Sequence, residues 1–394
     1  MVHHPRSDTS HHLHQSCGTT VAAVLVSVLA AGLAAESRAA EIAVQPIPAP
    51  YAKTLVVEPV PGSPGASGKA LIAALKKLDL KKPGRWLVKL EPGVYDLGEQ
   101  PLVLRPGIDV EGSGTLQTEI VGLGQDFSSP DFSFRKGVVI GAADVELRHL
   151  TVRCQNTNQL NACIVMANYQ ASPHLTDVRL LATDAEGEGH WGLRNDESSP
   201  VLDKVEILVA NGISNYALVN TFAGSRPEIR RTSLTAQNGT DQNVGVFNKV
   251  MALPELHSVD IDLVGGRIAA GVWTIQTEDE EIERGASTLP TLTMFDVDIE
   301  ARDAQESFGV LGGQLTIELR NSRVTVDRGS ALDVGPVGSV DVLNSELRAT
   351  DFLAHADRVR IVATWLRGGG DVLGYSEETC LGVHTDESTS DVCP

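Results

Sequence analysis

The spacing of prolines in the middle of the chain constrains the fold more than any other feature. A proline recurs every 27 residues, at Pro173, Pro200, Pro227 and Pro254. The next, Pro290, follows after 36 residues, and the acidic segment TEDEEIERG (277–285) supplies the extra nine. A fixed period of roughly 20 to 50 residues is typical of solenoids, in which each unit buries its apolar face only against its neighbours. We therefore expect a stack of coils.

Alignment on these prolines places apolar residues in three columns. Two residues after each proline lie Leu175, Leu202, Ile229, Leu256 and Leu292; five after lie Val178, Val205, Thr232, Val259 and Phe295; seven after lie Leu180, Ile207, Leu234, Ile261 and Val297. Only Thr232 departs from the apolar pattern. The last two columns are two residues apart, which is the period of a strand. All three columns are expected to face inward.

The second half of each coil has a pattern of its own. HWGLRND (190–196), NYALVNT (215–221) and NVGVFNK (243–249) align without gaps, and AAGVWTI (269–275) follows more loosely. A small residue recurs at Gly192, Ala217, Gly245 and Gly271. Three positions later come asparagines, with one more in the preceding coil: Asn168, Asn195, Asn220 and Asn248. Stacked asparagines predict a structural ladder in which each side-chain amide bonds the next coil.

A leucine-rich repeat is the competing solenoid, because L-x-x-V-x-L occurs at 175–180. It is excluded because Thr183 and its counterparts occupy the next ladder position, where that repeat requires Asn or Cys. Further along the coils shorten, since RNSRVTV (320–326) and LNSELRA (343–349) align 23 residues apart. The sequence thus predicts an all-β fold, a single-stranded parallel β-helix.

Both ends of such a stack need caps against edge-to-edge growth. Residues 67–78 predict a short N-terminal capping helix with Ser67 as N-cap and Leu71, Leu75 and Leu78 on one face. The expected organisation is a signal peptide at 1–40, an N-terminal segment with the capping helix at 41–85, the β-helix at 86–378 and a C-terminal disulfide cap at 379–394.

An apolar run near the N-terminus predicts export. VAAVLVSVLAAGLAA (21–35) has the length of a secretory h-region and is too short and Ala-rich to span a hydrocarbon core of ~30 Å. We expect cleavage after Ala34 or Ala39, no transmembrane segment in the mature chain, and a location in the periplasm, at the cell surface or outside the cell.

Four cysteines follow this run: Cys154, Cys163, Cys380 and Cys393. An even number in an exported protein indicates two disulfides. Local pairing, Cys154 with Cys163 and Cys380 with Cys393, is the simplest of the three connectivities.

The formal net charge of −19 limits the partners. So acidic a surface repels nucleic acid and anionic membranes, and it favours cations, although general solubility explains the charge as well.

Three segments resemble a known family. WLVKLEPGVYDL (86–97), IDVEGSG (108–114) and TEIVG (118–122) resemble the opening coils of the pectin-lyase-like superfamily, which includes the pectin methylesterases. The later alternation of SP-x-L-x-x-V-x-L with G-x-x-N is similar to bacterial secreted right-handed β-helix repeat proteins. The resemblance covers residues 54–382 and implies a right-handed parallel β-helix and export. It implies no activity, because a fold does not fix a function.

The catalytic motifs of three enzyme families in that superfamily are missing. Pectin methylesterases resemble one another in a mid-chain Gln, a Gln-Asp pair, a D-F-x-F-G segment and a later Arg-x-Trp. This chain has Gln125-Asp126 and DFSF (131–134) in one loop, Arg135 replaces the Gly, and no Arg-x-Trp follows. The motifs of pectate lyases and polygalacturonases have no match either. The sequence favours the scaffold without these three activities.

The strongest candidate site is acidic. VDIDL (259–263) and FDVDI (295–299) occupy aligned places in neighbouring coils, so four carboxylates are expected outward, on Asp260, Asp262, Asp296 and Asp298. Such a patch could bind Ca²⁺, which prefers oxygen ligands, or hold an acid beside a base. The alternative is a solvated acidic face. No cofactor is required by the sequence, and calcium is the candidate ion.

A second candidate is the loop TDAEGEGHW (183–191). Its Asp184, Glu186, Glu188, His190 and Trp191 could chelate calcium, or Trp191 could stack on a sugar ring; a structural turn is the alternative. The histidines His149, His174, His257 and His355 stand singly in strands with no acid or Ser in a known catalytic pattern, so surface or core roles are expected for them.

We therefore expect an exported, non-enzymatic β-helix that binds polysaccharide or cell-envelope components. The alternative is a polysaccharide-active lyase or glycoside hydrolase that uses the four aspartates.

Overall fold

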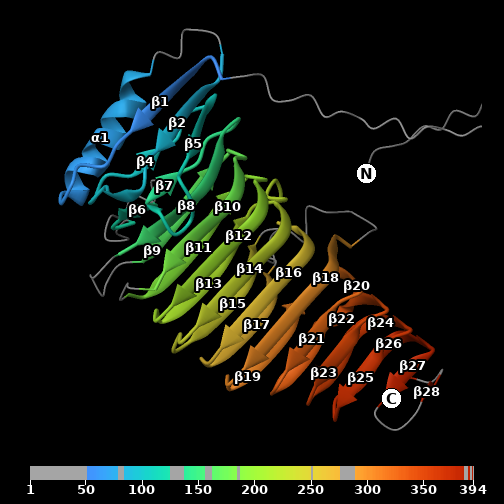
Figure 1. Cartoon of the computed structure of the whole chain (residues 1–394). Coiled ribbons are helices and arrows are strands. Elements are labelled where there is room, and N and C mark those ends of the chain that lie inside the picture. Colours follow the sequence, from blue (N-terminus) through green and yellow to red (C-terminus); the bar gives the residue numbers. More distant parts are fainter. Residues whose placement is uncertain are drawn as a thin grey trace, which may run out of the picture. The chain divides into compact units, whose positions relative to one another are not determined.

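Parallel pairing between strands one coil apart runs through the chain. The computed structural model describes residues 51–394 apart from 79–83, 125–136, 156–161, 184–186, 250–251, 276–288, 386–388, 391–392 and 394. Its 28 described strands form one sheet in which all pairs but the last are parallel. The prediction of an all-β, right-handed parallel β-helix is confirmed, and the strands succeed one another along the stack in Figure 1. The predicted signal peptide lies outside the described residues.

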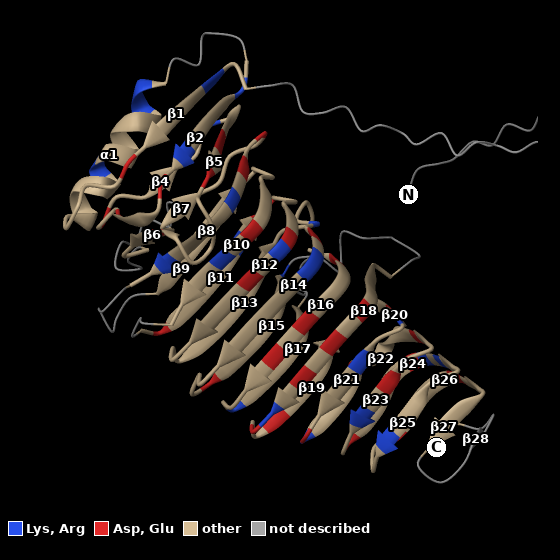
Figure 2. Ribbon diagram, in the orientation of Figure 1, with Lys and Arg blue, Asp and Glu red and all other residues tan. Residues whose placement is uncertain are grey.

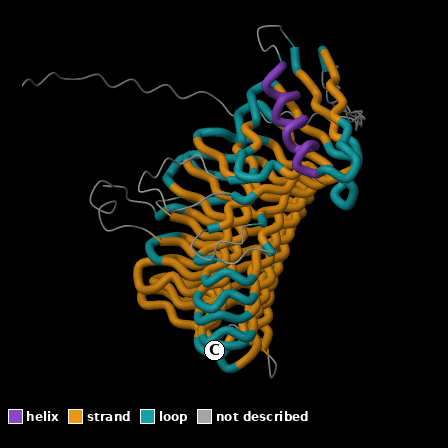
Figure 3. Tube along the Cα trace, turned by 90° about the vertical axis from the view of Figure 1, so that its left-hand side faces the viewer, coloured by secondary structure: helices purple, strands orange, loops and turns teal. Residues whose placement is uncertain are grey.

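Each coil has three faces, which we call A, B and C in chain order. Figure 3 shows the stacked coils from the left-hand side of Figure 1. Face A consists of β1 (Lys53–Val57), β2 (Trp86–Leu90), β5 (Ile108–Glu111), β20 (Thr316–Arg320) and the first parts of β8 (Glu146–Cys154), β10 (His174–Ala182), β12 (Val201–Ala210), β14 (Glu228–Gln237), β16 (Glu255–Val264) and β18 (Thr291–Arg302). Face B consists of the second parts of these six long strands with β3 (Gly93–Asp96), β6 (Thr118–Gly122), β21 (Arg323–Val326), β23 (Glu346–Ala349), β25 (Trp365–Gly368) and β27 (Val383–Thr385).

Face C consists of β4 (Leu102–Val103), β7 (Val139–Ile140), β9 (Cys163–Tyr169), β11 (Gly189–Asp196), β13 (Ser214–Thr221), β15 (Gln242–Lys249), β17 (Ile268–Ile275) and β19 (Glu306–Gly312). The last long strands, β22 (Gly329–Leu343), β24 (Phe352–Val362) and β26 (Asp371–Leu381), run along face C and then along face A of the following coil. A short β28 (Thr389–Ser390) pairs antiparallel with β27.

A residue with left-handed backbone separates face A from face B in ten consecutive coils. These corner residues, with φ between 48° and 58°, are His149, Asp177, Lys204, Arg231, Ser258, Asp296, Asn321, Asn344, Ala363 and Gly382. Such a conformation costs an L-residue about 1–2 kcal/mol, and it lets the strand bend without a loop. It also spaces the flanking inward residues by three, as in Leu175 and Val178, instead of by two.

The interior is filled by the predicted aliphatic columns. Leu175, Leu202, Ile229 and Leu256 lie opposite one another in successive strands, and each is fully buried. The exception, Thr232, is satisfied internally: its hydroxyl donates to the carbonyl of Arg230 at 2.8 Å and accepts the N–H of Val205 at 3.4 Å. In later coils Ser322, Ser345 and Thr364 also follow the corner and donate to the carbonyl two residues earlier.

The recurring small residue on face C has a packing cause. A Cβ on Gly192 would lie 2.1 Å from Cγ2 of Ile207, and one on Gly245 would lie 2.4 Å from Cγ2 of Ile261. Faces B and C thus approach too closely for a larger side chain at this position.

The N-terminal helix exists but begins earlier than expected. Helix α1 (Pro64–Lys77) starts with proline, whose missing N–H and fixed φ suit the first helical position, so Ser63 and not Ser67 is the N-cap. Ser67 is buried, and its hydroxyl donates to the carbonyl of Ser63 at 3.1 Å. The predicted apolar face is buried, and the helix packs on β3 and β1.

One predicted register is wrong. The alignment of Pro254 with Pro290 placed Phe295 beside Val259, but β16 and β18 pair Val259 with Val297 and His257 with Phe295, which is 43% exposed. The slip is two residues, because Pro290 does not correspond to Pro254. A shift of two keeps Leu292 and Val297 inward, and Phe295 is itself apolar, so the apolar pattern did not reveal the slip.

Both ends of the ladder extend past the expected limits of 86 and 378. β1 pairs with β2, and β26 continues to Leu381. Both disulfides of the local connectivity are present, Cys154–Cys163 and Cys380–Cys393. The first is buried between faces B and C, and the second ties residue 393 to the final long strand.

The corner conformation predicts an unusual effect of glycine. Ala363→Gly should raise the free energy of unfolding by up to about 1 kcal/mol, because relief of the left-handed strain exceeds the entropic cost of glycine. The same change in a regular strand, Ala349→Gly, should lower it. Urea denaturation compares the two; equal destabilisation by both would contradict a left-handed corner at Ala363.

Candidate functional site

The corner between faces A and B is hollowed along its C-terminal half. The groove there has a volume of about 700 Å³. Its floor consists of corner residues: Ser258, Asp296, Asn321, Asn344 and Ala363. Its wall on face B consists of Asp260, Asp298, Arg323, Glu346, Trp365 and His384. These six lie directly opposite one another in successive strands, so the wall offers one outward side chain every ~4.8 Å.

Hydrogen bonds and stacking order these side chains. Arg323 donates through two N–H groups to the carboxylate of Asp298, which raises the pKa of the guanidinium. The amide of Asn344 donates to Oδ1 of Asn321 at 2.8 Å. Trp365, 44% exposed, stacks on His384 with ring centroids 4.9 Å apart and an interplanar angle of 25°. The groove thus ends in a flat aromatic surface.

The structure rearranges the predicted patch of four aspartates. Asp260 lies opposite Asp298 on the groove wall, and not opposite Asp296, because of the two-residue slip. Asp296 is a corner residue on the floor, and its Oδ2 accepts the hydroxyl of Ser258 at 2.7 Å. Asp262 lies opposite Glu300, farther along face B, and binds Arg302 at 2.7 Å. The acidic segment 277–285 lies outside the described residues.

Calcium binding at this patch stays a prediction. In the part of the chain that the structure describes, no group of three or more His, Cys, Asp or Glu side chains is arranged to hold a metal ion. Arg302 and Arg323 already neutralise Asp262 and Asp298. Figure 2 shows basic and acidic segments interspersed along the stack.

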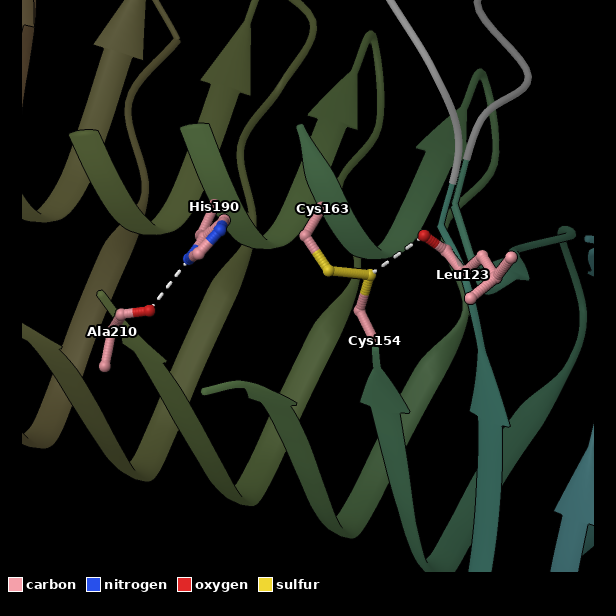
Figure 4. The surroundings of a disulfide bond; sticks show 5 residues. All are labelled: Leu123, Cys154, Cys163, His190 and Ala210. Atoms are coloured by element: carbon pink, nitrogen blue, oxygen red, sulfur yellow. Dashed lines mark hydrogen bonds between the residues drawn. A yellow bond between two sulfur atoms is a disulfide. The ribbon is translucent and has the colours of Figure 1, made fainter. Parts of the chain in front are cut away.

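The second candidate site does not assemble as one ligand set. Asp184 and Glu186 lie outside the described residues. His190 and Trp191 are consecutive in β11, so their side chains point to opposite faces of the strand. His190 is fully buried, level with Cys163 in the next strand, and its Nδ1 lies 2.8 Å from the carbonyl of Ala210 (Figure 4). Trp191 packs edge-on against Tyr216 on the outside.

The four asparagines form a buried ladder within the strands of face C. The amide of Asn168 donates to Asn195 at 2.8 Å, Asn195 to Asn220 at 2.9 Å, and Asn220 to Asn248 at 2.9 Å. All four are fully buried, and Thr274 accepts the last amide at 3.3 Å. Their bonds join coils, and none faces the groove.

His355 has an acid partner that no sequence pattern indicated. Its Nδ1 lies 2.8 Å from Oδ1 of Asp333 and its Nε2 lies 3.0 Å from the hydroxyl of Tyr375. His149 likewise lies 2.9 Å from Asp177. Because each partner stands in a neighbouring coil, no local spacing revealed these contacts; they follow only from the correct register of the coils.

Comparisons with solved structures give likenesses of fold. The mannuronan C-5 epimerase AlgE6 A-module from Azotobacter vinelandii shares 12% identity over 81% of this chain and 89% of its own, with a TM-score of 0.49. The catalytic domain of a GH87 α-1,3-glucanase shares 10% over 88% and 68%, at 0.44. A pectin methylesterase from carrot shares 10% over 84% and 88%, at 0.32.

At such low identity and TM-scores, we carry nothing of these proteins' activities to this chain. No protein-family model and no curated protein matches the sequence. Among the described residues, no helix is long and apolar enough to cross a membrane.

The buried histidine makes stability depend on pH. Burial lowers the pKa of His190. As the pH falls, the unfolded chain therefore binds a proton on this histidine near pH 6.5, before the folded protein does. This part of the stability is present above pH 6.5 and is lost as the pH falls toward the lowered pKa. His190→Asn, which imitates Asn215 in the next strand, should flatten the loss measured by denaturation at pH 7.5 and 5.0. The exposed control His174→Asn should not, and an unchanged slope in His190→Asn would contradict the account.

The arginine pairing predicts a weak response to calcium. Millimolar CaCl₂ should leave the thermal midpoint of the wild-type protein unchanged, because a cation would have to displace Arg302 or Arg323 from the carboxylates. Arg323→Gln frees Asp298 beside Asp260 and should gain a calcium-dependent rise. A large rise in the wild type would show that calcium has its own site.

Proposed function

We propose that this protein binds a polysaccharide chain lengthwise in the groove at the corner of faces A and B. The observation that carries the proposal is the wall of six outward side chains, one per coil, which ends in the stacked pair of Trp365 and His384. A sugar polymer is a long ligand with repeated hydroxyl groups and apolar ring faces. A wall that repeats every ~4.8 Å can bond one ring after another.

The groove supplies the chemistry that sugars need. Carboxylates and amides accept or donate to hydroxyls, and the exposed part of Trp365, beside the Arg367 guanidinium 5.4 Å from its ring centroid, offers apolar surface to a sugar ring. Ion pairing and stacking hold Arg323, Asp298 and Trp365 in place, which reduces the entropy lost on binding.

Charge selects the kind of polysaccharide. The groove is lined by four carboxylates, of Asp260, Asp296, Asp298 and Glu346, and by one guanidinium, of Arg323, which leaves an excess of three negative charges. A polyanion would be repelled, so the expected ligand is a neutral polysaccharide.

The setting we propose is extracytoplasmic. Two disulfides are stable in oxidising compartments and are rare in the cytosol. The apolar run at 21–35 supports the same location. Outside the cytoplasm, polysaccharides of the envelope or of the surroundings are accessible ligands.

Calorimetry with neutral and acidic oligosaccharides tests the proposal. The wild-type protein should bind a neutral oligosaccharide, and Trp365→Ala should weaken binding about two- to tenfold, because a stacked ring contributes about 0.5–1.5 kcal/mol. Trp86→Ala, which removes a partly exposed tryptophan from face A far along the chain from the groove, is the matched control and should bind normally.

Preference for the acidic oligosaccharides, or equal loss in both variants, would contradict binding in this groove. Release of reducing or unsaturated ends during the titration, if lost in Asp260→Asn or Asp298→Asn, would instead favour a lyase or hydrolase at the same wall.

A further inference from the structure

A row of aromatic side chains follows the outside of face C. Trp191, Tyr216, Phe247 and Trp273 contact one another in succession, with ring centroids 6.4, 5.3 and 5.6 Å apart. All four are partly exposed. They stand on four neighbouring strands of face C, which are β11, β13, β15 and β17, so the row runs along the stack and across the strands.

The same outward column continues into the polar cluster found in the later coils. Phe247 lies opposite Trp273, Trp273 opposite Leu311, Leu311 opposite Asp333, and Asp333 opposite His355. Two coil steps separate Trp273 from Asp333, a distance of ~10 Å. The aromatic row and the cluster therefore form one continuous track on face C.

The cluster has the geometry of a hydrogen-bonded relay. Asp333 Oδ1 accepts the Nδ1–H of His355 at 2.8 Å, which leaves the lone pair of Nε2 to accept the hydroxyl of Tyr375 at 3.0 Å. Phe352 stacks on the imidazole at 4.8 Å and 23°, which fixes the plane of the ring. The side chains of His355 and Asp333 are 16% and 23% exposed, and Tyr375 is 56% exposed. Only the hydroxyl-bearing residue is presented openly to a substrate.

This order of groups is that of a nucleophile, a base and the residue that orients the base. A phenol gives up its proton more readily than an aliphatic alcohol, and the imidazole that accepts it is already in contact. Asp333 acts through His355 by holding its tautomer and is a positioning residue.

We propose that Tyr375 and His355 form a hydrolytic site for acyl esters carried on a polymer that lies along the aromatic row. The phenolic oxygen attacks the ester carbonyl while its proton passes to Nε2 of His355. The alkoxide leaves with that proton as an alcohol, and an aryl ester remains on Tyr375. His355 then takes a proton from water, the hydroxide attacks the aryl ester, the carboxylic acid leaves, and the proton returns to the phenolic oxygen. No cofactor or oxidant is required.

This inference is independent of the groove, because it uses other residues, another face and another readout. Acyl esters are the expected substrates because the aryl ester that they form with Tyr375 is an activated intermediate that water cleaves readily. The ester is expected on a polymer because the aromatic row extends over four coils.

The experiment measures acetate released from 4-nitrophenyl acetate and from an O-acetylated polysaccharide. The wild-type protein should exceed the uncatalysed rate by about 10²–10⁴, the range of acid–base catalysis by a positioned side chain. Tyr375→Phe removes only the exposed hydroxyl and should abolish the excess without changing the thermal midpoint. His149→Gln, which removes a histidine paired to an aspartate but to no hydroxyl, should keep it.

Further readouts separate roles from structural effects. Asp333→Asn should lower kcat while KM stays unchanged, because it removes the carboxylate that orients His355 and leaves the substrate-facing residues in place. Brief reaction with 4-nitrophenyl acetate should add one acetyl group to the peptide that contains Tyr375. Trp273→Ala should raise KM for the polysaccharide ester alone.

An excess rate that survives in Tyr375→Phe, or a wild-type protein that releases acetate from neither ester, overturns the proposal. Hydrolysis of the small ester with no action on the polymer overturns the role of the aromatic row.

Discussion

A left-handed residue at the same place in successive coils is the constraint on which the rest of the structure depends. It bends each long strand between face A and face B within one residue, so no loop stands between the faces. Because the bend repeats in register, the outside of the corner becomes a continuous hollow, and its floor is the row of corner residues themselves. The wall of the groove follows, since Asp260 and its five partners each stand two residues after a corner and point outward in these six coils.

Buried polar side chains in the interior are hydrogen-bonded in ladders that run from coil to coil. Asn168 to Asn248 bond one another along face C, and the hydroxyls of Thr232, Ser322, Ser345 and Thr364 bond backbone groups beside the corner. An amide or hydroxyl left without a partner in such a core would cost about 1–3 kcal/mol, so each ladder position constrains the coil above and below it. These bonds act in the same direction as the aliphatic columns. Together they fix how far each coil is rotated on the next, which keeps the outward wall straight.

Much of this architecture could be predicted from the sequence, because a repeat is visible wherever successive coils have the same length. The 27-residue period located the columns of Leu175, Val178 and Leu180, the small residue at Gly192 and the asparagines. The corner is present in the same pattern, as the spacing of three between Leu175 and Val178, but this spacing alone does not show that Asp177 has a left-handed backbone. The slip at Pro290 followed from the insert between the coils, and it stayed hidden because Phe295, which the shift places wrongly inward, is itself apolar.

The sites were less predictable than the fold for the same reason. Asp260 and Asp298, or Asp333 and His355, come together only through the register of coils that differ in length, and a local motif cannot encode that. His190 and Trp191, by contrast, are adjacent in sequence and therefore suggest one ligand loop. Both lie in the strand β11, which points their side chains to opposite faces.

The most direct test of the account is disulfide trapping across the groove wall. With Asp260→Cys and Asp298→Cys in one chain, the two Cα atoms are ~4.8 Å apart, within reach of a disulfide, and mild oxidation should join them rapidly. With Asp260→Cys and Asp296→Cys the predicted separation exceeds ~7 Å, and trapping should be slow. Faster trapping of residue 260 with 296 than with 298 would contradict the register, and with it the corner column and the groove.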